Sequence, residues 1–173
     1  MKDTTIVVDN HMFAPNIKQQ PYKLVNDSIG YIYTGKFDYK IKDDLIETLK
    51  NTKGIIVDLR CYPSAFMVYP FIHEWLLNDS LPVASFSYPL INMPGYYGKR
   101  CIWFGTHNSN CYRGKVIVLV NDQTMSQAEY TTMVLQANPR TMVIGSQTNG
   151  ADGNVSFFQL PGEVNTAFSG MAV

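Results

Sequence analysis

The chain has 173 residues, of which 46% are hydrophobic and 16% charged, with 14 basic residues against 14 acidic ones. This length and apolar content suit one globular domain and exclude a disordered chain. The formal charge of zero offers no electrostatic attraction for nucleic acid or for an anionic membrane, so both partner classes are disfavoured. No apolar run is long enough to span a membrane, and no signal peptide is visible. Few charges together with 13% aromatic residues predict a partly apolar surface.

The cysteines and histidines specify neither a metal site nor a disulfide framework. Three cysteines are an odd number and no C-x-x-C pair occurs, although a bridge between Cys101 and Cys111 stays open. The histidines lack the spacing of metal ligands. We therefore expect no metal and no cofactor. The histidines are His11, His73 and His107.

The first third of the chain predicts alternating strands and helices. Residues 1–27 hold two prolines among short apolar patches and are expected to be irregular or edge structure. Ile29–Phe37, rich in β-branched and aromatic residues, predicts a strand. Apolar residues at helical spacing predict an amphipathic helix over about 40–51. The unbroken apolar run Ile55–Leu59 is typical of a strand covered on both faces.

The middle of the chain is richer in turns. Arg60–Ser64 predicts a turn, followed by an apolar helix to about Leu77 that Pro70 starts or kinks. Residues 80–112 are expected to be mainly loop, with two strands near Val83–Ser87 and Arg100–Phe104.

The last third returns to a regular alternation. A buried strand at Gly114–Val120, a helix at Ser126–Ala137 and a buried strand at Thr141–Gly145 are followed by β segments at Val155–Leu160 and Thr166–Met171. This order predicts an α/β fold with a mainly parallel central sheet flanked by helices. Because the last strand runs into the C-terminus without a closing helix, we expect a core that is truncated at that end.

Three polar segments follow buried strands, where α/β proteins place their chemistry. In the most suggestive one, Val120–Glu129, the strand ends, a polar turn follows and a helix begins at Ser126. A serine at a helix N-terminus is suited to nucleophilic attack, because backbone N–H groups there can stabilise an oxyanion. Ser126 and Glu129 also match an ordinary capping box, and the local pattern leaves both interpretations open. No G-x-S-x-G, S-x-x-K, H-E-x-x-H, G-x-G-x-x-G or Walker motif occurs.

Each of the other two segments, considered by itself, is weaker evidence for a functional site. Asp58 and Arg60 follow the first buried strand and are expected to point to opposite faces, so they need not pair; a turn stabilised by Arg60 is the simpler interpretation. Gly145–Asn154, with its glycines and Asx residues, predicts a tight loop that allows close approach, or else a plain β-turn.

Taken in order, the three segments resemble the core of the S41 family of serine peptidases, the tail-specific or C-terminal processing proteases and their tricorn-like relatives. Ile56–Ala65 matches the family pattern I-x-D-L-R-x-N-P-G-G, and Val118–Glu129 matches V-L-V-N-x-x-T-x-S-x-x-E. Val143–Gly150 matches V-I-G-x-x-T-x-G. The resemblance covers residue 28 to the end, and three ordered motifs are far more specific than any one of them.

The resemblance implies a fold, a reaction and site residues. It implies a ClpP/crotonase-like spiral core over 28–173, preceded by the irregular segment 1–27. It makes Ser126 the nucleophile of an acyl-enzyme mechanism. The backbone amides of Gln127 and Ser64 would form the oxyanion hole. Ala65 and Gly150 would contact substrate.

Two departures from the family pattern bear on activity. Processing proteases carry a general-base lysine in a G-K-G triplet, whereas Gly150–Gly153 contains none. Tricorn-like members use a histidine and acidic partners drawn partly from outside this core, so the base stays unassigned. Tyr62–Ala65 also replaces the usual Asn-Pro-Gly-Gly.

These departures keep alternatives open beside the serine peptidase. The first is a catalytically degenerate S41-like peptide-binding module. The second is an acyl-CoA hydratase or isomerase on a related spiral, which the lack of a basic cluster near the motifs disfavours. The expected partner is a peptide or unfolded protein added as a strand to a sheet edge. By family habit, the expected location is the bacterial periplasm, cell envelope or exterior, while oligomeric state and specificity stay open.

Overall fold

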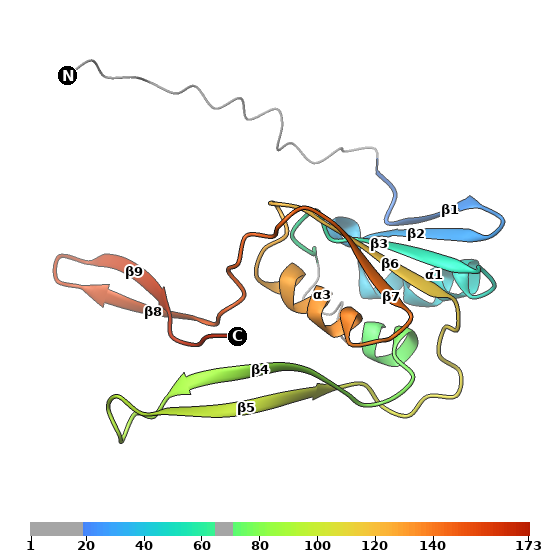
Figure 1. The fold of residues 1–173 in the computed structure, drawn as a ribbon. Helices are drawn as coiled ribbons and strands as arrows, with labels where there is room; N and C mark the ends of the chain where they lie inside the picture. The colour runs from blue at the N-terminus through green and yellow to red at the C-terminus, as the bar shows by residue number, and fades with distance from the viewer. Residues whose placement is uncertain (1–18, 65–70) are drawn as a thin grey trace, which may run out of the picture.

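The computed structural model describes residues 19–64 and 71–173, which build a central sheet, its covering helices and two long hairpins (Figure 1). The central sheet has five strands in the order β1-β2-β3-β6-β7. β2, β3, β6 and β7 run parallel, and β1 pairs antiparallel with β2 at one edge. The predicted α/β fold with a mainly parallel central sheet is confirmed. The strands are β1 (Tyr22–Asn26), β2 (Ile29–Tyr33), β3 (Gly54–Asp58), β6 (Lys115–Val120) and β7 (Thr141–Gly145).

The described helices pack against one face of this sheet. In-register residues such as Ile32, Val57 and Val118 point to that face and are at most 2% exposed. On the opposite face, Met142 and Ile144 of β7 are 62% and 46% exposed. The buried strand expected at Thr141–Gly145 is therefore covered on one face only, and the second face of β3 is partly exposed at Ile56. The helices are η2 (Thr34–Lys36), η3 (Tyr39–Ile41), α1 (Lys42–Leu49), the π-helix η4 (Ile72–Leu76) and α3 (Gln127–Gln136).

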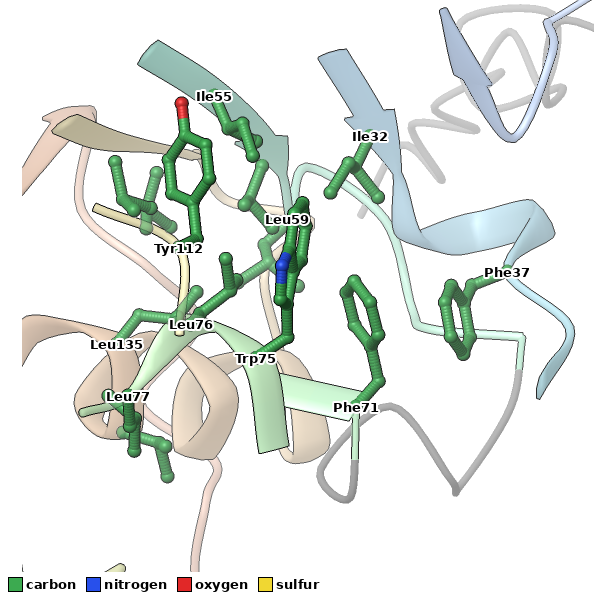
Figure 2. Close-up of a cluster of buried hydrophobic side chains, with 14 of the residues drawn as sticks. Ile32, Phe37, Ile55, Leu59, Phe71, Trp75, Leu76, Leu77, Tyr112 and Leu135 are labelled. Atoms are coloured by element: carbon green, nitrogen blue, oxygen red, sulfur yellow. The ribbon is translucent and has the colours of Figure 1, made fainter. Parts of the chain in front are cut away.

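The core holds η4 and the preceding Phe71 against the sheet (Figure 2). Four rings run in series, with centroids 5.1 Å apart from Phe37 to Phe71, 5.4 Å from Phe71 to Trp75 and 5.2 Å from Trp75 to Tyr112. Each such side chain contributes about 1.5–3 kcal/mol by leaving water. The helix predicted up to Leu77 falls partly on residues 65–70, including Pro70, outside the described residues.

Two antiparallel hairpins complete the fold and run in the same direction away from the sheet (Figure 1). The first, β4 (Leu81–Pro89) and β5 (Tyr97–Phe104), extends beyond both of its predicted strands. The second is β8 (Val155–Leu160) and β9 (Val164–Ser169). Two backbone hydrogen bonds between Ser87 and Ala172 join β4 to the segment after β9.

The remaining differences from the sequence analysis are local. The segment 1–27, expected to be irregular or edge structure, contributes the edge strand β1 in its described part. The strand expected over Ile29–Phe37 stops at Tyr33 because a 3₁₀ turn follows. Cys61, Cys101 and Cys111 are all free, so the Cys101–Cys111 bridge is not formed.

Candidate functional site

Ser126 lies where a strand of the central sheet leads into a helix. β6 ends at Val120 and α3 begins at Gln127, which makes Ser126 the N-cap residue. Its backbone has φ 52° and ψ −113°, a region that residues other than glycine rarely occupy. A nucleophile on a sharp strand-to-helix turn is typically held in strained backbone of this kind, which the surrounding structure must enforce. A helix cap alone does not need this strain.

Thr124 fixes the turn that precedes Ser126. Its side chain is fully buried, and its Oγ1 donates to the carbonyl oxygen of Leu59 at 2.8 Å. Its own carbonyl oxygen accepts the Asn149 N–H at 3.0 Å. One residue therefore ties the serine turn to the end of β3 and to the loop after β7, which joins the three sequence motifs in space.

Glu129 connects Ser126 to the same loop. Its carboxylate accepts the N–H of Ser126 at 3.0 Å, of Gly150 at 2.5 Å and of Ala151 at 2.8 Å. The side chain is 7% exposed, and burial alone would raise its pKa. The hydrogen bonds from Thr148 and the three amides outweigh burial and hold the pKa of Glu129 below its ordinary value. The capping-box geometry predicted for Ser126 and Glu129 is thus present, with the carboxylate also bonded to a second loop.

The loop after β7 approaches the serine turn closely. Gly145 has φ 148°, and a Cβ there would lie 1.8 Å from the carbonyl oxygen of Val120. Only glycine fits this position, which agrees with the predicted close-approach loop. Gly150, with φ 74°, gives its N–H to Glu129. Its described role is to hold the loop in place.

Asp58 and Arg60 form a bidentate ion pair at the end of β3, which corrects the expectation that they point apart. The guanidinium donates to the Asp58 carboxylate at 3.0 Å and 2.8 Å, and the Tyr31 hydroxyl donates to it at 2.6 Å. Residues two apart lie on the same side of a strand, and β3 ends at Asp58, so Arg60 folds back. Burial would raise the pKa of Asp58, but the bonds from Arg60 and Tyr31 hold it below its ordinary value.

The turn after β3 is held by Ser64. Its backbone N–H donates to the Thr34 carbonyl oxygen at 3.0 Å, and its hydroxyl donates to the Phe37 carbonyl oxygen at 2.6 Å. In this conformation the Ser64 amide is bonded to Thr34, the first residue of η2. It is therefore not available to an oxyanion without loss of that bond.

A pocket of about 930 Å³ opens beside Ser126 and Gln127. One wall is the β4–β5 hairpin. The ring of Phe86 in this wall packs against the ring of Tyr130 on α3, with 6.2 Å between the ring centroids. The opposite wall belongs to the β8–β9 hairpin and the loop before it. The pocket is mainly apolar and aromatic, with contributions from Phe86, Tyr88, Ile102, Tyr130, Val155 and Phe157.

Two charged residues also line the pocket. Arg100 of β5 is one of the lining residues on the hairpin wall. Asp152 lies on the other side, where burial and the negative charge of Glu129 raise the pKa of its carboxyl group. The lining thus combines an apolar interior with one positive and one acidic group, a composition suited to an organic ligand such as a peptide side chain.

The structure brings some of the predicted site residues together. Ser126 and Gln127 line the pocket, whereas Ser64 and Gly150 do not. Ala65 lies outside the described residues.

His107, the one histidine whose side chain belongs to the described part of the chain, does not line the pocket. His107 is exposed in the loop after β5. His73 belongs to η4, and His11 lies outside the described residues.

Sequence reasoning predicted shorter forms of both strands of this hairpin but did not predict that they form a pocket wall. Residues 80–112 were expected to be mainly loop because of their prolines and glycines. The alternation Ser85-Phe86-Ser87-Tyr88 was the available signal, since it places both aromatic side chains on one face of a strand.

Solved structures with a similar fold place this chain among α/β proteins whose fold occurs in several peptidases. A putative peptidase from Parabacteroides merdae has a TM-score of 0.75 at 22% identity, over 94% of this chain and 55% of the other. The photosystem II D1 C-terminal processing protease has a TM-score of 0.60 at 16% identity, over 91% and 44%. A lipoprotein from Streptococcus agalactiae has a TM-score of 0.56 at 21% identity, over 87% and 57%. The chain thus spans about half the length of these structures.

A family model matches part of the sequence. Residues 87–170 match the model of peptidase family S41, a segment that includes Ser126, Glu129 and Gly150. Together with the shared fold, this match confirms the resemblance to the S41 family that the three motifs predicted. The sequence has no significant match among curated proteins.

Proposed function

We propose that the protein is a serine peptidase that hydrolyses peptide bonds through an acyl-enzyme on Ser126. The observation that carries this proposal is the strained backbone of Ser126 at the wall of the pocket, within the segment matched to peptidase family S41. A serine that only capped a helix would need neither the positive φ nor the adjoining pocket.

In the proposed reaction, Ser126 Oγ attacks the carbonyl carbon of the scissile peptide bond and loses its proton to a general base. The backbone N–H of Gln127, the next residue in the chain, donates to the oxyanion of the tetrahedral intermediate. Collapse of the intermediate releases the amine product and leaves an ester on Ser126. Water then hydrolyses the ester and restores the hydroxyl group.

This proposal assigns no residue as the second oxyanion donor and none as the general base. The Ser64 amide, expected as the second donor, is bonded to Thr34, so a donor from the segment 60–70 would have to be another amide. Among the described residues that line the pocket, none is a lysine or a histidine. The described pocket wall therefore supplies neither a lysine nor a histidine as the base.

The pocket supports a substrate class. Its aromatic walls suit an apolar side chain of a peptide or an unfolded protein. A contact of Gly150 with the peptide backbone requires its loop to move toward Ser126, and a contact of Ala65 stays part of the proposal. β7 is the last strand in the described order of the central sheet, so its outer edge can accept an extended peptide.

A catalytically degenerate peptide-binding module is the second candidate. It is favoured by Ala151 in the place of the family's lysine and by the described pocket lining without lysine or histidine. In this case the pocket binds apolar peptides without cleaving them.

Active-site labelling separates the two candidates. The wild-type chain and Ser126→Ala are treated with a fluorophosphonate probe and compared by intact-mass spectrometry. The peptidase proposal expects one adduct on the wild type and none on Ser126→Ala, with Ser64→Ala as the matched control that keeps its adduct. No adduct on the wild type, together with retention of apolar peptides, would assign the degenerate module.

We also propose a location in the bacterial cell envelope or periplasm, on the family resemblance. One protein with the same fold is described as a lipoprotein. In the described residues, no helix is long and apolar enough to cross a membrane. Fractionation of the native host with an antibody to this chain tests the location.

A further inference from the structure

The turn that connects β4 to β5 exposes an unusual number of large apolar side chains. Ile91 is 93% exposed, Met93 50%, Tyr96 63% and Tyr97 69%. We refer to residues 90–97 as the hairpin tip. Soluble proteins rarely present so many neighbouring apolar side chains to water unless the patch has a partner.

The hairpin tip has a defined shape. The N–H of Leu90 donates to the carbonyl oxygen of Tyr96, the N–H of Met93 to Leu90, and the N–H of Tyr96 to Met93, each at 3.0 Å. Figure 1 shows this turn at the end of the hairpin that lies farthest from the central sheet. The apolar side chains therefore sit on a convex, structured projection.

The charge around the hairpin tip has one sign. Residues 81–104 contain no aspartate or glutamate, and their two charged residues are Lys99 and Arg100. Both are exposed, and neither has a carboxylate partner among the described residues. The β4–β5 hairpin is therefore cationic, although the formal charge of the whole chain is zero. By contrast, Glu163 is the only charged residue of the β8–β9 hairpin, over 155–169.

The spacing of apolar and cationic residues matches the depth of a membrane interface. Lys99 and Arg100 follow Tyr97 by two and three residues, which places them roughly 7–10 Å behind it along an extended strand. Interfacial segments bury their apolar side about 5–10 Å into the boundary between headgroups and acyl chains. Tyrosine rings are enriched at this boundary because they have an apolar body and a polar hydroxyl.

We propose that the hairpin tip, with Lys99 and Arg100 behind it, docks this protein on a membrane surface that contains anionic lipid. Lipid chains close around a convex projection, whereas a protein partner would need a matching groove. The cations then lie at the level of the lipid headgroups and oppose their negative charge. The same hairpin carries Phe86 and Tyr88 on the pocket wall, so docking brings the pocket close to the membrane.

The docking proposal stands apart from the proposed peptidase activity, and its test measures only membrane association. The 173-residue chain is sedimented with vesicles of phosphatidylcholine alone and of phosphatidylcholine mixed with phosphatidylglycerol. We expect binding to the mixed vesicles that salt weakens. Lys99→Gln and Arg100→Gln each lower the affinity by about fivefold, and the double variant by about thirtyfold.

Variants of the apolar side chains complete the test. The triple change Ile91→Ser, Tyr96→Ser and Tyr97→Ser is expected to abolish vesicle binding, because it removes the inserted surface. Val164→Ser, at a residue 55% exposed on the other hairpin, is the matched control and retains full binding. Circular dichroism and thermal unfolding of each variant establish that the fold is kept. In addition, the emission of a Tyr96→Trp variant should shift to the blue with the mixed vesicles.

Three outcomes would overturn the proposal. The first is no binding to the mixed vesicles, and the second is binding that the triple variant retains. The third is capture by immobilised polyglutamate that depends on Lys99 but not on the apolar side chains, which would assign the surface to an acidic protein partner instead.

Discussion

Replacement of Glu129 is the sharpest test of how the serine turn is held. Glu129→Gln preserves the size of the side chain, but its amide nitrogen cannot accept a hydrogen bond, so the N–H groups of Ser126, Gly150 and Ala151 compete for one oxygen. A hydrogen bond to a charged group contributes about 1.5–3 kcal/mol, and a buried donor left unpaired costs a similar amount. We therefore expect Glu129→Gln to lower the free energy of unfolding by about 2–3 kcal/mol.

The assay is urea unfolding at neutral pH, with Glu47→Gln as the matched control. Glu47 is 73% exposed and forms an ion pair with Lys50, so its replacement should change the free energy of unfolding by less than about 0.5 kcal/mol. If Glu129→Gln costs no more than this control, the carboxylate does not hold the two loops together and the reasoning is refuted.

The same pair of proteins tests the pKa of Glu129. Because its pKa in the folded protein lies below the ordinary value of 4.5, the ionised carboxylate contributes its full stabilisation above that value. The contribution is lost as the pH falls through the lowered pKa. The stability difference between wild type and Glu129→Gln should therefore be constant near neutrality and narrow in acid. A difference that widens in acid would contradict the assigned direction.

Three further substitutions probe the frame around the site. Asp58→Asn should lower the free energy of unfolding by about 2 kcal/mol, because it removes the charge of a buried carboxylate whose partner Arg60 is 48% exposed. An effect below about 0.5 kcal/mol in thermal unfolding would contradict a structural ion pair. Gly145→Ala should cost at least about 3 kcal/mol or prevent folding, since its Cβ would meet the Val120 carbonyl oxygen at 1.8 Å; the yield of soluble folded protein measures this. Ser126→Gly should be about 1 kcal/mol more stable than Ser126→Ala, because glycine relieves the positive φ; equal stabilities in urea would argue against strain.

Periodicity and motif order predicted the central sheet well. The apolar runs that became β3, β6 and β7 are surrounded by turn residues, so their positions were clear from local pattern alone. The same runs led to a wrong prediction of burial on both faces. Apolar composition alone does not show whether other elements pack against the second face of a sheet. Met142 and Ile144 are exposed although their strand is as apolar as its neighbours.

The site was predicted less evenly. The position of Ser126 before a helix followed from the strand-turn-helix pattern, but its positive φ arises from contacts of Thr124 and Glu129 with distant loops. Long-range contacts of this kind leave no trace in local sequence. The pairing of Asp58 with Arg60 could have been predicted, since residues two apart share a side of a strand. The hairpin wall was hidden by its prolines and glycines.

The join between Ser87 and Ala172 has a consequence for hydrogen exchange. A two-stranded hairpin is marginally stable by itself, and the two backbone bonds of this join are the pairing that connects the β4–β5 hairpin to the segment after β9 among the described residues. Amides of both hairpins should therefore exchange through local opening, at a lower free energy than those of β3 and β6, which are paired on both sides. Ser126 follows β6, whose amides should exchange slowly. The hairpins that form the pocket walls should exchange faster. A ligand that spans the two hairpins would be detected by the slowed exchange of Ser87 and Ala172, before any change in the central sheet.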